Sequence, residues 1–140
     1  MNKRTRARRA ALQALYQWQL TGHSAAEIGA QFEEDERLEK VDRELFAMLV
    51  REVAAQAEDL DVLLGAHADR EIARIDPVER AVLRLAAYEL KCRPEVPWRV
   101  VINEAVELAR GFGAEQSHRY VNAVLDRLAR ELRASEIGTG

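Results

Sequence analysis

The fold of this chain is decided by the stretch Asp76-Pro-Val-Glu-Arg-Ala-Val-Leu-Arg-Leu-Ala-Ala-Tyr-Glu-Leu90. Its first residues are a helix start signal, because Asp76 can cap the first turn and Pro77 fits the first helical position. Glu79 follows the cap at the third position, as in a capping box. Apolar side chains then recur at helical spacing, at Val82, Leu83, Leu85, Ala86 and Leu90. The stretch therefore predicts an amphipathic helix with one buried stripe.

The residues after this stretch predict two further helices. Arg93-Pro-Glu-Val-Pro97 ends the first helix, since a proline inside a helix costs about 3 kcal/mol. Pro97 can open a second helix, which Gly111-Phe-Gly113 ends. The apolar stripes of the second and last helices are Val101, Ile102, Ala105, Leu108 and Ala109, then Val121, Val124, Leu125, Leu128 and Leu132. We expect a domain over residues 1–134 and a flexible tail over 135–140.

The N-terminal half also has a helical pattern. A first helix is predicted up to Gly22, and Ser24-Ala-Ala-Glu27 is a capping box that opens a short second one. Asp42 can cap a long helix that continues to Gly65. The apolar positions of these helices are Leu12, Leu15, Tyr16 and Leu20, then Ile28 and Phe32, then Leu45, Leu49, Val53, Leu60 and Leu64.

Length and composition agree with a compact all-α domain of about six or seven helices. The 140 residues are most simply one domain, and no segment alternates apolar and polar residues as a strand does. Cys92 is the only cysteine, which excludes an internal disulfide and a multi-cysteine zinc site. A reducing, cytoplasmic setting is expected. No apolar run approaches the roughly 20 residues needed to cross a bilayer.

The sequence offers no constellation for catalysis, metal binding or a cofactor. His23, His67 and His118 are scattered and have no second ligand at helical spacing. The glycines at 111 and 113 follow a helix rather than a strand, so they do not indicate a phosphate-binding loop. We therefore expect no catalytic residues, no metal and no cofactor, and assign no enzymatic activity.

Basic and acidic residues are unevenly distributed along the chain. The first twenty residues hold five bases and no acid, whereas residues 21–71 hold fourteen acids against five bases and the net charge is -3. A local basic segment can attract a polyanion even on an acidic protein. A solvated, frayed terminus is the alternative. Leu12 and Leu15 continue the basic segment as an apolar stripe, which would dock it on the fold.

Three stretches of the sequence resemble the NusB family. The most specific stretch is Val101-Ile-Asn-Glu-Ala-Val-Glu-Leu-Ala-Arg110, followed by Gly111-Phe-Gly-Ala-Glu-Gln-Ser-His-Arg-Tyr-Val-Asn-Ala-Val-Leu125. Residues 79–90 and the N-terminal arginines with Ala14-Leu-Tyr-Gln-Trp-Gln-Leu20 are also similar. Residues from about 22 to 70 are least distinctive.

The resemblance implies two stacked helical bundles without enzymatic activity. It implies a transcription antitermination factor that supports ribosomal RNA transcription. Such factors pair with NusE, a small-subunit ribosomal protein, and bind single-stranded boxA RNA. RNA polymerase and other Nus factors complete the expected assembly, and a homodimer is possible.

Two alternatives remain open. The chain is also similar to the RNA-targeting domain of ribosomal RNA cytosine methyltransferases. It stops where their catalytic domain would begin, which favours a stand-alone factor. A helical protein-interaction bundle that binds no RNA is the other alternative.

Candidate RNA-binding residues follow from chemistry together with the resemblance. Arginine forks bind phosphates and tyrosines stack on unpaired bases. The predicted set is Arg4, Arg6, Arg8, Arg9, Tyr16, Gln116, Arg119 and Tyr120. A half-buried tyrosine with its hydroxyl in water is the alternative role for Tyr16 and Tyr120. The two ends of the chain would together form one cationic, aromatic platform.

Other polar positions receive different roles. The acidic segment could face a basic NusE-type partner, and Glu79 is a candidate partner contact. Asn103 and Asn122 interrupt apolar stripes, so we expect both to hydrogen-bond loop or helix-end backbone and to have a structural role. Arg127, Arg130 and Arg133 are expected on a solvated face, where they could also extend the basic surface.

Overall fold

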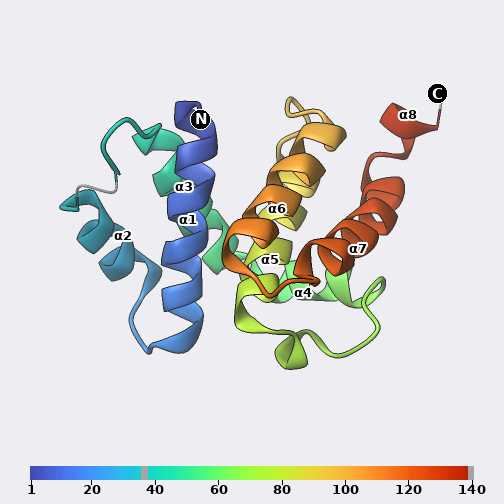
Figure 1. The fold of residues 1–140 in the computed structure, drawn as a ribbon, viewed down its shortest axis with the longest axis horizontal. Helices are drawn as coiled ribbons and strands as arrows, with labels where there is room; N and C mark the ends of the chain where they lie inside the picture. Colours follow the sequence, from blue (N-terminus) through green and yellow to red (C-terminus); the bar gives the residue numbers. More distant parts are fainter. Residues whose placement is uncertain (36–37, 139–140) are drawn as a thin grey trace. The chain divides into compact units, whose positions relative to one another are not determined.

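A computed structural model of the chain describes residues 1–35 and 38–138, and these residues form helices and loops without a β-strand. The predicted all-α class is confirmed. The chain divides into two compact units, Met1–Gln56 and Ala57–Gly140, called unit 1 and unit 2 below (Figure 1). The assignment of residues 1–134 to one domain stays a prediction.

Unit 1 consists of three helices, α1 (Lys3–Leu20), α2 (Ala25–Glu33) and α3 (Arg43–Ala55). Each contacts the other two. Their shared core includes a stacked pair of rings, Phe32 and Phe46, with centroids 5.9 Å apart. The N–H of Asp42 also donates to the carbonyl of Lys3 at 3.1 Å, which ties the start of α3 to the start of α1.

Unit 2 is built on three mutually packed helices, α5 (Pro77–Cys92), α6 (Trp98–Phe112) and α7 (Ser117–Leu132). Helix α4 (Ala57–Gly65) packs on α5 and α7, and the short 3₁₀ helix η2 (Ile72–Arg74) lies against α4. A last short helix, α8 (Ala134–Ile137), contacts α7. The predicted stripes of α5, α6 and α7 are buried at most of their positions.

The predicted helix starts are confirmed at their caps. Ser24 accepts a hydrogen bond from the N–H of Glu27 at 3.1 Å, and Asp42 accepts one from Leu45 at 3.0 Å. Asp76 accepts from the N–H of Val78 at 2.9 Å. Each oxygen satisfies a first-turn donor that the helix itself leaves unpaired.

The long helix predicted from Asp42 to Gly65 is wrong in one respect, because it is broken at Gln56. This residue has φ -103° and ψ 11°, and its N–H closes the last turn of α3 by donating to the Glu52 carbonyl at 3.0 Å. Helix α4 then begins at Ala57. The break coincides with the boundary between the two units.

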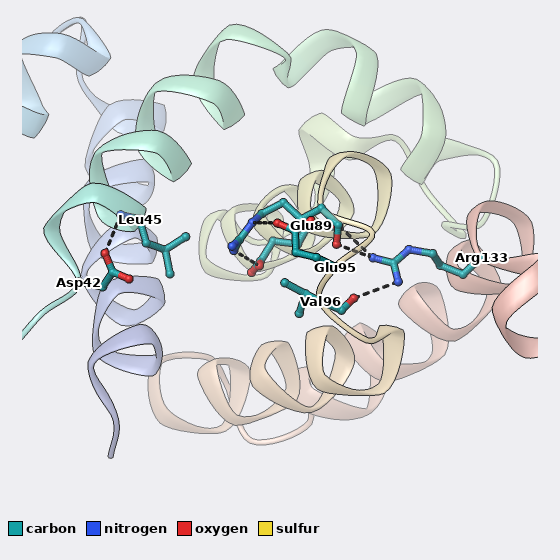
Figure 2. A network of polar contacts seen from close by, with 7 residues as sticks. Asp42, Leu45, Glu89, Glu95, Val96 and Arg133 are labelled. Atoms are coloured by element: carbon teal, nitrogen blue, oxygen red, sulfur yellow. Dashed lines mark hydrogen bonds and ion pairs between the residues drawn. The ribbon is translucent and has the colours of Figure 1, made fainter.

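Arg133 closes the corner between α5 and α6 (Figure 2). Its side chain is 6% exposed, and the guanidinium points at the end of α5 and the loop that follows. It donates to four backbone carbonyls, those of Glu89 at 3.2 Å, Leu90 at 2.8 Å, Arg93 at 3.0 Å and Val96 at 3.0 Å. The prediction that Arg133 lies on a solvated face is therefore wrong.

The segment after Arg133 folds back onto unit 2. The carboxylate of Glu136 accepts a hydrogen bond from the N–H of Trp98 at 3.0 Å and is paired with Arg133 at 2.6 Å. These two contacts hold the pKa of Glu136 below its usual range, the Trp98 bond more strongly. The tail predicted over residues 135–140 is thus helical as far as Ile137, and residues 139–140 lie outside the described part.

Candidate nucleic-acid interface

Helix α1 displays a polar stripe with arginines at one end and a tyrosine at the other. Arg6, Arg9, Gln13 and Tyr16 follow one another at alternating spacings of three and four, which places them on one face of the helix. Arg9 is exposed, and the other three are half-buried. We call these four residues the arginine–tyrosine stripe.

The arginines lie at the end of α1 that least favours positive charge. The N-terminal turn of a helix has the positive end of the helix dipole, and α1 has no acid in its first turn. Clustered cations there oppose the dipole, so they do not stabilise the helix. The same end attracts anions, both through its N–H groups and through the arginines.

Arg4 and Arg8 lie outside this stripe. Arg4 is exposed at the start of α1, whereas Arg8 is only 4% exposed and interacts with neighbouring groups of the chain. Its face continues into the buried Leu12 and Leu15. Exposure therefore favours Arg4 and the stripe as RNA contacts, and an RNA contact by Arg8 stays a prediction.

The start of α7 presents the unit 2 residues of the predicted set. Arg119 and Tyr120 lie in its first turn, and Gln116 is the N-cap residue directly before it. Gln116 and Arg119 are exposed, and Tyr120 is half-buried. Gln116 and Tyr120 are four residues apart, so they share a face of the helix. This end of α7 thus displays an amide, a cation and an aromatic ring.

Tyr120 has two partners that the sequence did not reveal. Its hydroxyl donates to the Asp69 carboxylate at 3.0 Å, and the Arg70 guanidinium lies over its ring, 5.0 Å from the centroid. Burial raises the pKa of the tyrosine hydroxyl, and the bond to Asp69 adds to the shift. No local pattern could have indicated these contacts, because Asp69 and Tyr120 are 51 positions apart.

Glu79 has an internal role at the same end of α7. Its carboxylate accepts a hydrogen bond from the hydroxyl of Ser117 at 2.8 Å, which joins the first turn of α5 to that of α7. Ser117 is buried and Glu79 is half-buried. This bond fixes where the exposed residues of α7 begin, and a partner contact by Glu79 stays a prediction.

Gly113 permits the tight turn that leads into α7. A Cβ atom at this position would lie 2.8 Å from the carbonyl oxygen of Ala109 and 2.9 Å from the Cβ of Ser117. Only glycine fits such a close approach. The Gly-Phe-Gly segment of the sequence therefore sets the position of Ser117 and of the residues after it.

The predicted residues divide between the two units. Arg4, Arg6, Arg8, Arg9 and Tyr16 belong to unit 1, and Glu79, Gln116, Arg119 and Tyr120 belong to unit 2. That they form a single platform stays a prediction. In the described ranges we find no cluster of three or more side chains suited to hold a metal ion, and no helix long and apolar enough to span a membrane.

Comparison with known proteins adds independent evidence. A sequence model described as the NusB family matches residues 5–130. Transcription antitermination protein NusB of Hahella chejuensis is 50% identical over 137 residues, which cover 98% of this chain and 92% of the relative. The protein of that name from Alcanivorax borkumensis is 53% identical over 133 residues, or 95% of this chain and 89% of the relative.

Two solved structures are similar in fold. The crystal form of T. maritima NusB superposes with a TM-score of 0.78 at 30% identity, covering 94% of each chain. A chain from a crystal structure of antitermination factors NusB and NusE in complex with double-stranded RNA gives a TM-score of 0.79 at 28% identity. That match covers 91% of this chain and 96% of the other.

Proposed function

Since this chain belongs to the NusB family, we propose that it is a transcription antitermination factor that binds RNA together with a NusE-type ribosomal protein. Its RNA would be a single-stranded boxA-type leader, and its role would be to support ribosomal RNA transcription. The relatives at about half identity have this factor's name, and one similar structure holds NusB with NusE and RNA. The proposal assigns no catalytic activity.

The observation that supports RNA binding best is the arginine–tyrosine stripe. An acidic protein with net charge -3 places five bases and no acid in its first twenty residues. The stripe is part of a folded helix, so the backbone that carries its guanidiniums is already ordered before RNA binds. Phosphates fit the arginine end, and an unpaired base fits the tyrosine end.

The acidic residues support a basic protein partner. The segment 21–71 has a formal balance of fourteen acids against five bases, and many of these acids are exposed on α2, α3 and α4. A basic ribosomal protein would be attracted to exposed acids in either unit, which speeds encounter. RNA polymerase and further Nus factors belong to the same proposal, with Glu79 as the nominated partner contact.

The test changes two arginines of the stripe. Arg6→Ala/Arg9→Ala should weaken binding to a labelled U-rich single strand, measured by fluorescence anisotropy with the NusE-type protein present. The slope of log affinity against log salt should become shallower by about 1.4, or 0.7 for each lost phosphate contact on a single strand. Arg8 is left intact because it is buried, so replacing it would lower the stability of the fold as well as any RNA affinity.

The matched control removes the same charge elsewhere. Arg51 and Arg110 are 67% and 57% exposed, and each is paired with an acid of its own helix. Arg51→Ala/Arg110→Ala should leave the salt slope unchanged. Equal slopes for the stripe variant and the control would remove the stripe from the RNA site. A duplex of the same sequence, run in parallel, tests the preference for a single strand.

A further inference from the structure

The loop between α4 and η2 is fastened along one face of α7. The Nε2 of His67 is 2.8 Å from the Glu131 carboxylate, and Arg127 donates to the His67 carbonyl at 2.6 Å. At the start of α7, the Tyr120 hydroxyl donates to Asp69 at 3.0 Å. Tyr120, Arg127 and Glu131 are spaced by seven and four residues, so they lie on one face of the helix.

The Asp69 carboxylate accepts three hydrogen bonds from two side chains. Arg70 donates to it from Nε at 2.8 Å and from a terminal nitrogen at 3.0 Å, and Tyr120 adds a third bond. Arg70 and Tyr120 together lower the pKa of Asp69 from 3.8 to about 2. Yet the side chain of Asp69 is 62% exposed, so an ion from solution can reach it.

This donor set suits a phosphate as well as it suits a carboxylate. A guanidinium fork makes two parallel bonds to either anion, and a hydroxyl can add a third. The Arg70 fork is already oriented by its position over the Tyr120 ring. The exposed Gln116 and Arg119 lie at the same N-terminal end of α7 and could contact the nucleotides on either side.

Building on the proposed function, we propose that the Arg70 guanidinium and the Tyr120 hydroxyl form a phosphate subsite for RNA, which the Asp69 carboxylate fills in the free protein. When RNA binds, a backbone phosphate replaces the carboxylate between the same donors. Asp69 is then an internal competitor of the RNA. Arg70 becomes an RNA contact, and the tyrosine contributes its hydroxyl in addition to its ring.

The proposal predicts a gain of affinity from the loss of an acid. Asp69→Asn keeps the size of the side chain and one acceptor for Tyr120, but it removes the charge that competes with phosphate. RNA affinity should rise about two- to fivefold, the size expected when an exposed ion pair no longer has to be broken. Asp59→Asn is the matched control, because Asp59 is an exposed acid of α4 in the same unit.

Replacing either donor should lower the RNA affinity. Arg70→Gln should bind RNA about tenfold more weakly, since it loses bonds to a charged group. Its salt slope should be shallower by about 0.7, which a purely structural role would not change. Tyr120→Phe keeps the ring, so its loss should be only about threefold. In the Arg70→Gln background, Asp69→Asn should no longer raise the affinity.

The measurement is anisotropy of a labelled U-rich single-stranded RNA with the full chain and saturating NusE-type protein, together with a thermal melt of each variant. Weaker or unchanged binding by Asp69→Asn, relative to Asp59→Asn, overturns the subsite. An unchanged salt slope for Arg70→Gln does the same. If the wild-type chain binds no RNA with its partner present, the proposed function itself fails. If Arg6→Ala/Arg9→Ala weakens binding while the Asp69 and Arg70 variants do not change it, the subsite alone fails.

Discussion

Single residues in this protein connect segments that are far apart in the sequence. Arg133 reaches carbonyls 37 to 44 positions away, and Tyr120 reaches an acid 51 positions away. The role predicted for Tyr120 in RNA binding came from the resemblance to the NusB family together with the ability of tyrosine to stack on unpaired bases. The sequence could not predict Asp69 and Arg70, since their importance depends on a contact across the fold.

Burial at the residue scale was also predicted incompletely. Asn103 and Asn122 interrupt apolar stripes in the sequence, but both are exposed, and their hydrogen bonds to loop or helix-end backbone stay a prediction. A helical stripe defined by spacing is only a few residues wide, so a polar residue at its edge can face water instead. Glu89 shows the opposite case, because it is 2% exposed and pairs with Arg93 at 2.9 Å. Nothing in the sequence distinguishes it from the surface acids.

Replacing Arg133 should destabilise the fold strongly. Arg133→Met fills a similar volume but leaves the carbonyls of residues 89, 90, 93 and 96 without their donor. We expect a loss of about 3–5 kcal/mol in the free energy of unfolding, typical of breaking a buried charged network. Arg130→Met, at a 62% exposed side chain, should change it by less than about 0.5 kcal/mol. Urea unfolding curves of the two variants compare them directly.

Asp69 should make stability depend on pH in acid. Its pKa is lowered in the fold from 3.8 to about 2, so the ionised form is favoured by folding. The resulting stability is fully present above pH 3.8 and is lost as the pH falls towards 2. Asp69→Asn should lack this part of the decline, whereas Asp59→Asn should retain it. Parallel unfolding profiles for wild type and Asp69→Asn across this window would contradict the assignment.

At the scale of elements, the caps and breakers were predictable and the break at Gln56 was not. Ser24, Asp42 and Asp76 cap the helices that their patterns predicted, because a capping oxygen acts on its own first turn. Residues 54–57 are Ala, Ala, Gln and Ala, all good helix formers, so local propensity favours a continuous helix. The end of α3 must therefore be set by packing rather than by local sequence.

Two glycines near the end of α6 should respond in opposite directions to the same substitution. Gly111→Ala meets nothing within 4 Å, so it should stabilise the protein by about 0.5–1 kcal/mol through the higher helix propensity of alanine. Gly113→Ala places a methyl group 2.8 Å from a backbone oxygen and should destabilise by about 1–3 kcal/mol. Thermal melts of both variants are the measurement. Equal shifts of the same sign would mean that the turn before α7 is not as tight as described.

At the scale of the whole molecule, composition predicted the all-α fold class. The boundary between the two compact units is known only from the contacts between helices. The scarcity of glycine and proline and the helical stripes were enough for an all-α fold. The two compact units depend on which helices contact one another, and no linker of glycine, proline or serine marks residue 56. The uneven distribution of charge is visible in the sequence. Which charged residues bind RNA and which bind a protein partner is not.

Shortening the chain tests how far the fold extends. A chain that ends at Leu132 lacks Arg133 and Glu136, so the end of α5 and the start of α6 lose their donors and acceptor. It should be at least as unstable as Arg133→Met. A chain that ends at Gly138 keeps both residues and should unfold at the wild-type urea concentration. A stable chain ending at Leu132 would show that the corner does not need Arg133.

The position of Arg133 in the sequence also affects the order in which parts of the protein can fold during synthesis. Proteins emerge from the ribosome starting at the N-terminus, and domains generally fold as units once they are available. The helices of unit 1 find one another within the first 56 residues. In unit 2, the carbonyls of Glu89 and Leu90 at the end of α5 must wait for a guanidinium that is translated 43 to 44 residues later. Until then these carbonyls are without that donor, so we expect the corner between α5 and α6 to be among the last parts of unit 2 to become ordered.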